Sequence, residues 1–345
     1  MKIAIVTPAA AGSRHGNRHT AARWATLLRR FGHRVVIEQT WSGVPADVMI
    51  ALHARRSHDS ARRFKLAYPA RPLAVALTGT DVYRDIATDA SARATLRLAD
   101  RLVVLQERAL DRLRAGLRRK THVIYQSARR TARTQALTSC FEVLVSGHLR
   151  QEKDPFRVAA SLQYIPEESA IRVVHLGKAL SDETAREARE WMAREPRYRW
   201  LGEVPHAEAR RRLARSRVMV ISSRMEGGAN VVSEALAAGV PVLASRISGN
   251  VGMLGSDYAG YFPVENERAL ARLLKRAESD PSFYLKLKKQ CVARRILVQP
   301  QREARCLKRL LDDLNRTIRA PRPRSRRRYW SGRARDSRRP QPGSG

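Results

Sequence analysis

Short apolar runs alternate with helical patterns along most of the 345 residues, and this alternation predicts an α/β fold. The first half has strand-like runs, rich in β-branched residues, at 3–7, 34–38, 48–52, 73–78, 102–106 and 122–126. The second half repeats the rhythm at 141–146, 171–176, 198–201, 218–222 and 241–245, before helical patterns at 267–279, 281–297 and 301–318. Strands separated by helices of this length predict two parallel, doubly wound sheets.

A lapse in the apolar pattern divides the chain into two Rossmann-like domains. We predict an N-terminal domain at 1–128, a linker at 129–139, a C-terminal domain at 140–299 and a C-terminal helix at 300–318. The tail at 319–345 is rich in Arg, Pro, Gly and Ser, a composition that predicts disorder. Two such domains enclose a cleft, and ligands of doubly wound sheets bind beyond the carboxyl ends of the strands.

The stretch 218–239 reads as a strand, a loop with two adjacent glycines, and an alanine-rich helix that Gly239 ends. A helix N-terminus offers unpaired N–H groups, and glycine lets a diphosphate approach them closely. Glu226 and Glu234 bracket the loop; carboxylates repel phosphate but accept hydrogen bonds from hydroxyls. The pattern favours a nucleotide-sugar, with the diphosphate on the helix end, ribose on one glutamate and hexose on the other. A plain strand, loop and helix with two solvated glutamates is the alternative.

Three loops at the carboxyl ends of first-half strands carry polar or cationic side chains. The candidate acceptor-binding residues there are Arg14, His15, Gly16, Asn17, His53, Arg55, Arg56, Thr78, Gly79 and Thr80. His15, His53 and Asp81 are of the types that orient a water molecule. The plainer interpretation is that these are ordinary loop residues, with Asn17 and Asp81 acting as local caps.

Composition limits the class of protein. The length suffices for two full cores, no apolar run is long enough to span a membrane, and the first strand has no signal-peptide features. The three cysteines, an odd number, lack metal-ligand spacing, so we expect a reducing cytoplasm. There is no Asp-x-Asp motif, and we expect no metal or other cofactor.

The formal net charge of +35 often indicates nucleic-acid binding. Much of the excess is arginine spread over helices beside acidic residues, and a further block of arginine lies in the tail. We therefore expect nonspecific polyanion contact through the tail and no specific nucleic-acid site. An inactive basic scaffold is the alternative, against which intact Glu226, Glu234 and Lys153 argue.

Three motifs resemble the family-four glycosyltransferases of the GT-B fold over residues 1–318. They are Gly147 and Leu149 with Lys153, the Leu-Gly-x-Val-Pro stretch at 201–205, and Glu226-Gly227-Gly228 with Glu234. The resemblance implies that donor binding falls on Gly147, His148, Arg150, Lys153, Gly202, Val204, Glu226, Gly227, Gly228, Ala229, Asn230, Val231 and Glu234. It assigns ribose to Glu234, the transferred sugar to Glu226 and the base to the backbone at 202–204. Lys153 would neutralise the leaving group. With Glu226 at the transferred sugar and Asp81 and His15 as residues that could orient water, it completes the set of catalytic candidates.

Two positions depart from that family's pattern. His148 stands where an arginine usually follows the glycine, and Thr80 stands where a histidine usually precedes the aspartate. The strings GSRHGN, IALHARRS, LTGTDVYRDI and SGHLRQEKDPF are similar to those of the selenosugar synthases of selenoneine biosynthesis.

That narrower resemblance implies transfer of N-acetylglucosamine or glucose from a UDP-sugar to selenophosphate, with inversion to the β anomer. Loss of phosphate then gives a 1-selenosugar. Because selenophosphate is anionic and soft, it needs no strong general base, which makes Thr80 tolerable at its position. Hexose transfer to an ordinary hydroxyl acceptor is the alternative.

Overall fold

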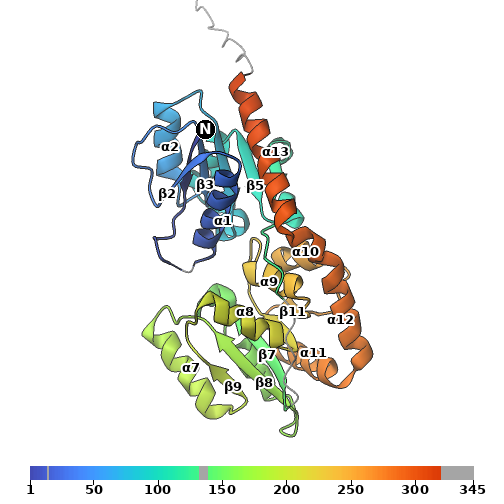
Figure 1. The fold of residues 1–345 in the computed structure, drawn as a ribbon. Helices are drawn as coiled ribbons and strands as arrows, with labels where there is room; N and C mark the ends of the chain where they lie inside the picture. The colour runs from blue at the N-terminus through green and yellow to red at the C-terminus, as the bar shows by residue number, and fades with distance from the viewer. Residues whose placement is uncertain (14, 132–138, 320–345) are drawn as a thin grey trace, which may run out of the picture.

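Two six-stranded parallel sheets, one in each half of the chain, form the framework of the protein (Figure 1). The computed structural model describes residues 1–13, 15–131 and 139–319, so most of the predicted linker and all but the first residue of the predicted tail lie outside the described residues. The predicted fold class, two doubly wound domains, is confirmed.

The N-terminal sheet has the strand order β2-β1-β3-β4-β5-β6. Its strands are β1 (Lys2–Val6), β2 (Arg34–Glu38), β3 (Val48–Leu52), β4 (Leu73–Leu77), β5 (Arg101–Val104) and β6 (Thr121–Val123). Every residue of β3 and β4 is buried, as their uninterrupted apolar sequences require of central strands covered on both faces. The covering helices are α1 (Gly16–Arg30), α2 (His58–Ala67), α3 (Ile86–Thr88), α4 (Ala90–Leu98) and α5 (Ala115–Arg118).

The C-terminal sheet has the order β12-β11-β10-β7-β8-β9. Its strands are β7 (Phe141–Ser146), β8 (Ile171–Leu176), β9 (Tyr198–Trp200), β10 (Val218–Ile221), β11 (Val242–Ser245) and β12 (Tyr261–Phe262). The covering helices are α6 (Arg157–Leu162), α7 (Asp182–Arg194), α8 (His206–Arg215), α9 (Asn230–Ala238), α10 (Ser248–Leu254), α11 (Glu267–Ser279) and α12 (Pro281–Arg294). The sequence pattern did not predict β12, because two residues are too few to show a strand period.

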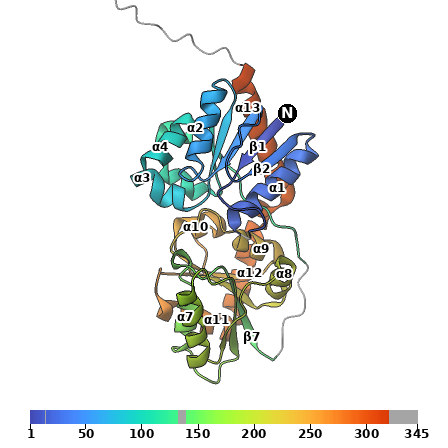
Figure 2. The ribbon, with the colours of Figure 1, turned by 90° about the vertical axis from the view of Figure 1, so that its left-hand side faces the viewer.

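The last helix, α13 (Pro300–Arg319), returns to the N-terminal domain and runs beside its sheet (Figures 1 and 2). Leu307, Leu310, Leu311 and Leu314 are buried in the core that also contains Trp24 of α1. Their spacing places them on one face of the helix. The sequence predicted this helix as a separate final element, and the structure shows that it completes the core of the first domain.

An ion-pair cluster fixes the far end of α13. Asp313 accepts hydrogen bonds from Arg101 and from His122, the latter at 3.0 Å. The bond from the Arg101 guanidinium is the main reason that the pKa of Asp313 falls to about 2. Among the described residues, no helix is both long and apolar enough to cross a membrane.

A candidate active site between the two domains

A cavity of about 880 Å³ lies between the domains, and both contribute to its walls. The segments that line it follow every strand of the first sheet and β7, β8, β9 and β10 of the second. These are the carboxyl ends of the strands, where the sequence placed the candidate site. The described residues hold no group of histidine, cysteine or acidic side chains with the arrangement of a metal site.

The N-terminus of α9 faces this cavity without a side-chain cap. Ala229 occupies the N-cap position, and the first turn has no acidic residue. Side chains cap four other helices, namely those of Asp89, Ser181, Asn266 and Asp280, whereas α2, α5, α6, α8 and α10 also begin without one. Helix α1 also begins uncapped, and a Cβ atom added to its first residue, Gly16, would lie 3.5 Å from Asn230 Nδ2. Two uncapped helix N-termini therefore meet at one place, which suits an anion.

The paired glycines of the α9 loop serve the contact between domains. A Cβ on Gly227 would lie 2.3 Å from the carbonyl oxygen of Thr78, and a Cβ on Gly228 would lie 2.7 Å from Leu105 Cβ. Neither distance is possible for a real side chain. Sequence reasoning explained these glycines by the approach of a ligand, whereas in the structure they let the first domain come close.

Lys153 and Glu226, two of the catalytic candidates, bond to each other at the cavity. Lys153 ends the short helix η3 (Gln151–Lys153), and its ammonium donates to Glu226 Oε1. The Ser223 hydroxyl donates to the same oxygen at 2.6 Å. The ammonium keeps further N–H groups for an anion, and the second carboxylate oxygen can accept from a hydroxyl.

Glu234 lies one turn inside α9 and accepts a hydrogen bond from the His206 ring at 2.7 Å. This bond is the main reason that the pKa of His206 is raised. Val204 lines the cavity beside them, whereas Gly202, a predicted donor-binding residue, does not. The remaining predicted donor residues all line it: Gly147, His148, Arg150, Lys153, Glu226, Gly227, Gly228, Ala229, Asn230, Val231 and Glu234.

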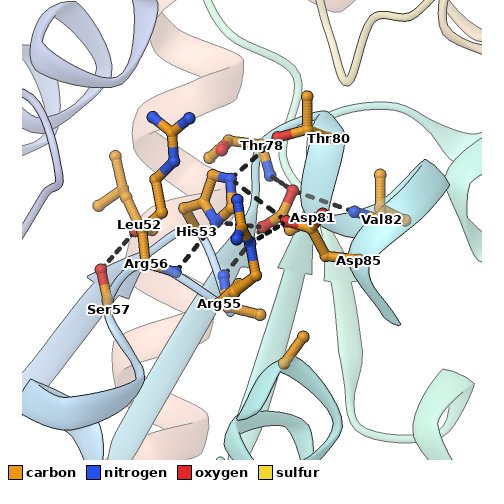
Figure 3. Close-up of polar contacts among 12 residues, drawn as sticks. Leu52, His53, Arg55, Arg56, Ser57, Thr78, Thr80, Asp81, Val82 and Asp85 are labelled. Carbon is orange, nitrogen blue, oxygen red and sulfur yellow. Dashed lines mark hydrogen bonds and ion pairs between the residues drawn. The ribbon is translucent and has the colours of Figure 1, made fainter. Parts of the chain in front are cut away.

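On the opposite wall, the His53 ring determines whether the Thr80 hydroxyl donates or accepts a hydrogen bond at the cavity (Figure 3). The backbone N–H of Arg56 donates to His53 Nδ1 at 3.3 Å, and Nε2 lies 2.9 Å from Thr80 Oγ1. Burial lowers the pKa of His53, so the ring is neutral near pH 7. Because Nδ1 accepts, the proton is on Nε2 and is donated to Thr80. The Thr80 hydroxyl, which lines the cavity, is then left with its own proton to donate.

Asp81 has a structural role instead of the predicted one in orienting water. Its side chain is fully buried, and Oδ1 accepts from the backbone N–H groups of Thr78, Gly79 and Val82 at 2.8–3.0 Å. Oδ2 accepts from Ala54 N at 3.0 Å. Asp81 does not line the cavity but ties together the loops after β3 and β4, as the plainer interpretation of the sequence held.

The other predicted acceptor residues divide into two sets. Those that line the cavity are His15, Gly16, Asn17, His53, Arg56, Thr78, Gly79 and Thr80. Arg55 does not line it, because its guanidinium is bonded to Asp85 at 2.9 Å (Figure 3). Arg14 lies outside the described residues.

Helix α1 contributes two cavity residues that sequence reasoning missed, His19 and Arg23. With His15 they are spaced by four and so form one stripe of the helix, beside the buried stripe that contains Trp24. Each faces a residue of the second domain. The pairs are His15 with His148 and His19 with His206, with ring centroids 5.6 and 5.7 Å apart, and Arg23 with Asn230, 3.4 Å between Nη1 and Oδ1. The spacing alone could have revealed this stripe.

His148 supplies no positive charge at neutral pH. Its Nδ1 accepts from the backbone N–H of Lys178 at 3.1 Å. Burial is the main reason that its pKa is lowered, and the neighbouring His15 lowers it further. The position where the family-four pattern has an arginine is therefore occupied by a neutral ring.

Comparison with known proteins identifies a family match in the second domain and structures that share the fold. Residues 133–294 match the family model described as glycosyl transferases group 1. HepE of Anabaena, solved in complex with UDP and glucose, superimposes with a TM-score of 0.71 at 16% identity, over 91% of this chain and 99% of that chain. Sucrose-phosphate synthase of Thermosynechococcus elongatus superimposes with a TM-score of 0.74 at 16% identity, over the same 91% and 99%. An α,α-trehalose-phosphate synthase of Burkholderia vietnamiensis gives 0.65 at 11% identity, over 89% and 79%.

These likenesses define the fold as GT-B, the glycosyltransferase architecture of two Rossmann-like domains facing a cleft. The second domain, which contains the α9 loop, is the part that matches the group 1 glycosyl transferase family.

Proposed function

We propose that the protein is a UDP-sugar-dependent glycosyltransferase that forms a carbon–selenium bond. It transfers N-acetylglucosamine or glucose to selenophosphate and then releases phosphate, which gives a 1-selenosugar for selenoneine biosynthesis in the cytoplasm.

The donor assignment is supported by the wall that the second domain provides. The uncapped N-terminus of α9 suits a diphosphate, and Glu234 and Glu226 are acceptors for ribose and hexose hydroxyls. HepE, which shares the fold, has been solved in complex with UDP-glucose. A UDP-sugar is therefore the donor that fits best.

The observation that carries the acceptor assignment is that the Thr80 hydroxyl acts as a hydrogen-bond donor toward the cavity. His53 donates to its hydroxyl, so Thr80 presents a proton to the cavity instead of a basic site. Both carboxylate oxygens of the neighbouring Asp81 accept hydrogen bonds from backbone N–H groups, so Asp81 does not act as a base there. This part of the wall suits an acceptor that is already anionic, and Arg56 and His15 line the cavity with it.

In the proposed reaction, the selenium of selenophosphate attacks the anomeric carbon as the bond from that carbon to the UDP oxygen breaks. The β anomer forms with inversion. UDP leaves with the electron pair of the broken bond, and the Lys153 ammonium and the α9 N–H groups stabilise its charge. Water then cleaves the selenium–phosphorus bond, which releases inorganic phosphate and the selenol.

The test is mass spectrometry of the purified protein incubated anaerobically with selenophosphate and either UDP-N-acetylglucosamine or UDP-glucose. We expect a product with the selenium isotope pattern on a hexose mass, formed in step with UDP. Thiophosphate and acceptor-free reactions are the controls. Release of UDP without selenium in the product would reject selenophosphate and favour transfer to a hydroxyl acceptor.

A further inference from the structure

Arg23 is the member of the α1 stripe that carries a permanent charge. Its Nε donates to both oxygens of Glu303, at 2.9 and 3.1 Å, and its Nη1 lies 3.4 Å from Asn230 Oδ1. The side chain is 23% exposed and lines the cavity. It is therefore held in one orientation, between a buried anchor and the start of α9.

Glu303 is an unusually well-connected anchor. Its side chain is fully buried, although it comes from α13, 280 residues along the chain from Arg23. It also accepts from Trp24 Nε1 at 2.9 Å and from the backbone N–H of Ser127 at 3.1 Å. A carboxylate with this many donors fixes the fork of the guanidinium rigidly.

The guanidinium still has capacity to donate. Nη2 is buried, and it has no hydrogen-bond partner among the described residues. Because Nη2 is buried, the group that can reach a ligand in the cavity is Nη1, which uses at most one of its two N–H groups on Asn230. On the opposite wall, Lys153 is paired with Glu226 but keeps further N–H groups, and Arg150 also lines the cavity, so Arg23 would complete a set of cationic donors that both domains supply.

We propose that Arg23 is a donor-binding residue whose guanidinium donates to the diphosphate of the nucleotide at the N-terminus of α9, and that Glu303 is its positioning residue. This inference rests on the proposed function, because it assumes the diphosphate at that helix end. The first domain then contributes to donor binding as well as to acceptor binding. A bound diphosphate links α1 to α9 and holds the two domains together.

The experiment is calorimetric titration of UDP and of uridine into the full chain and its variants. Uridine has the base and ribose of UDP but no phosphate, so it reports on every part of the donor site except the one in question. For Arg23→Gln we expect UDP affinity to fall roughly tenfold to a hundredfold, the range for hydrogen bonds to charged groups, with uridine affinity unchanged. The control is Arg30→Gln, an exposed residue of the same helix, for which we expect neither affinity to change.

A second variant guards against misfolding. Arg23→Gln leaves Glu303 without its charged partner, so the double variant Arg23→Gln/Glu303→Gln, which removes both charges, is measured beside it. We expect it to lose UDP affinity selectively as well. If UDP and uridine affinities fall together, or if UDP binding is unchanged, the assignment of Arg23 is overturned while the proposed function stands. If the wild-type protein binds no UDP, the proposed function falls, and this inference with it.

Discussion

The two walls of the cleft are built in opposite ways. The centre of the second-domain wall is one continuous segment, in which β10 leads through the glycine loop to α9, and loops after β7, β8 and β9 complete it. The wall of the first domain is assembled from segments that follow all six strands, one stripe of α1 and, through Glu303, a helix near the end of the chain. The first kind of wall can be read from local sequence, and the second only from the fold.

The walls also differ in what their polar groups are free to do. On the α9 side the helix end is uncapped, and the Lys153–Glu226 pair is open to a ligand. On the other side, many polar groups that seemed available bond to one another or to the backbone, as Arg55 does to Asp85 and Asp81 does to four N–H groups. Residue type thus separated cavity-lining groups from groups that bond within the protein better on the α9 wall than on the other.

The largest expected effect is on the second-domain wall. We expect Lys153→Ala to lower kcat by roughly a hundredfold to a thousandfold, about 3–4 kcal/mol, because a preorganised donor to the leaving diphosphate is lost. Steady-state release of UDP checks this. Lys286→Ala, an exposed lysine of α12, is the control. A kcat within a few-fold of wild type would mean that this wall binds the donor without assisting its departure.

How far the sequence predicts this molecule follows the same division. Strands such as β2, β3, β7 and β8 have the predicted bounds, because β-branched runs between turn residues define them locally. The start of α9 at Asn230 was equally local. The return of α13 to the first domain was not predictable, because an amphipathic helix reveals that it has a buried face but not which core it covers.

The same limit applies to single residues. Arg23 gave no local signal of its partner, because Glu303 meets it only through the tertiary fold. Asp81 looked like a site residue, since a carboxylate after a strand can bind a ligand or cap a loop with equal ease. Only its four backbone donors decide between the two roles.

Both walls rest on a buried neutral histidine, and acid should test the second-domain wall through His175. This ring is fully buried; its Nε2 lies 3.2 Å from the Gly147 carbonyl and its Nδ1 lies 2.8 Å from the Tyr198 hydroxyl. Burial lowers its pKa from 6.5 to about 4. Between the folded pKa of about 4 and the unfolded pKa of 6.5, the unfolded chain binds a proton at His175 that the folded chain does not. The fold therefore has its full stability above pH 6.5 and loses stability as the pH falls toward 4.

We therefore expect the free energy of unfolding to fall by roughly 3 kcal/mol between pH 6.5 and pH 4 through His175 alone. Urea denaturation of the wild type and of His175→Gln across this pH range measures the contribution of His175 to the free energy of unfolding. The variant should be less stable at pH 7 and lose less on acidification. His58→Gln in α2, which keeps both buried histidines, should lose as much stability on acidification as the wild type. Parallel curves for His175→Gln and wild type would contradict the assignment.

The smallest expected effect is on the first-domain wall, where one hydroxyl is at issue. Thr80→Val keeps the shape of the side chain but removes the proton that His53 leaves for the cavity. We expect KM for selenophosphate to rise roughly tenfold, the worth of one hydrogen bond to an anion, with UDP affinity unchanged. Thr80→Ser, which keeps the hydroxyl, should restore KM. If Thr80→Val instead weakens UDP binding and leaves KM for selenophosphate intact, the two walls do not divide donor from acceptor.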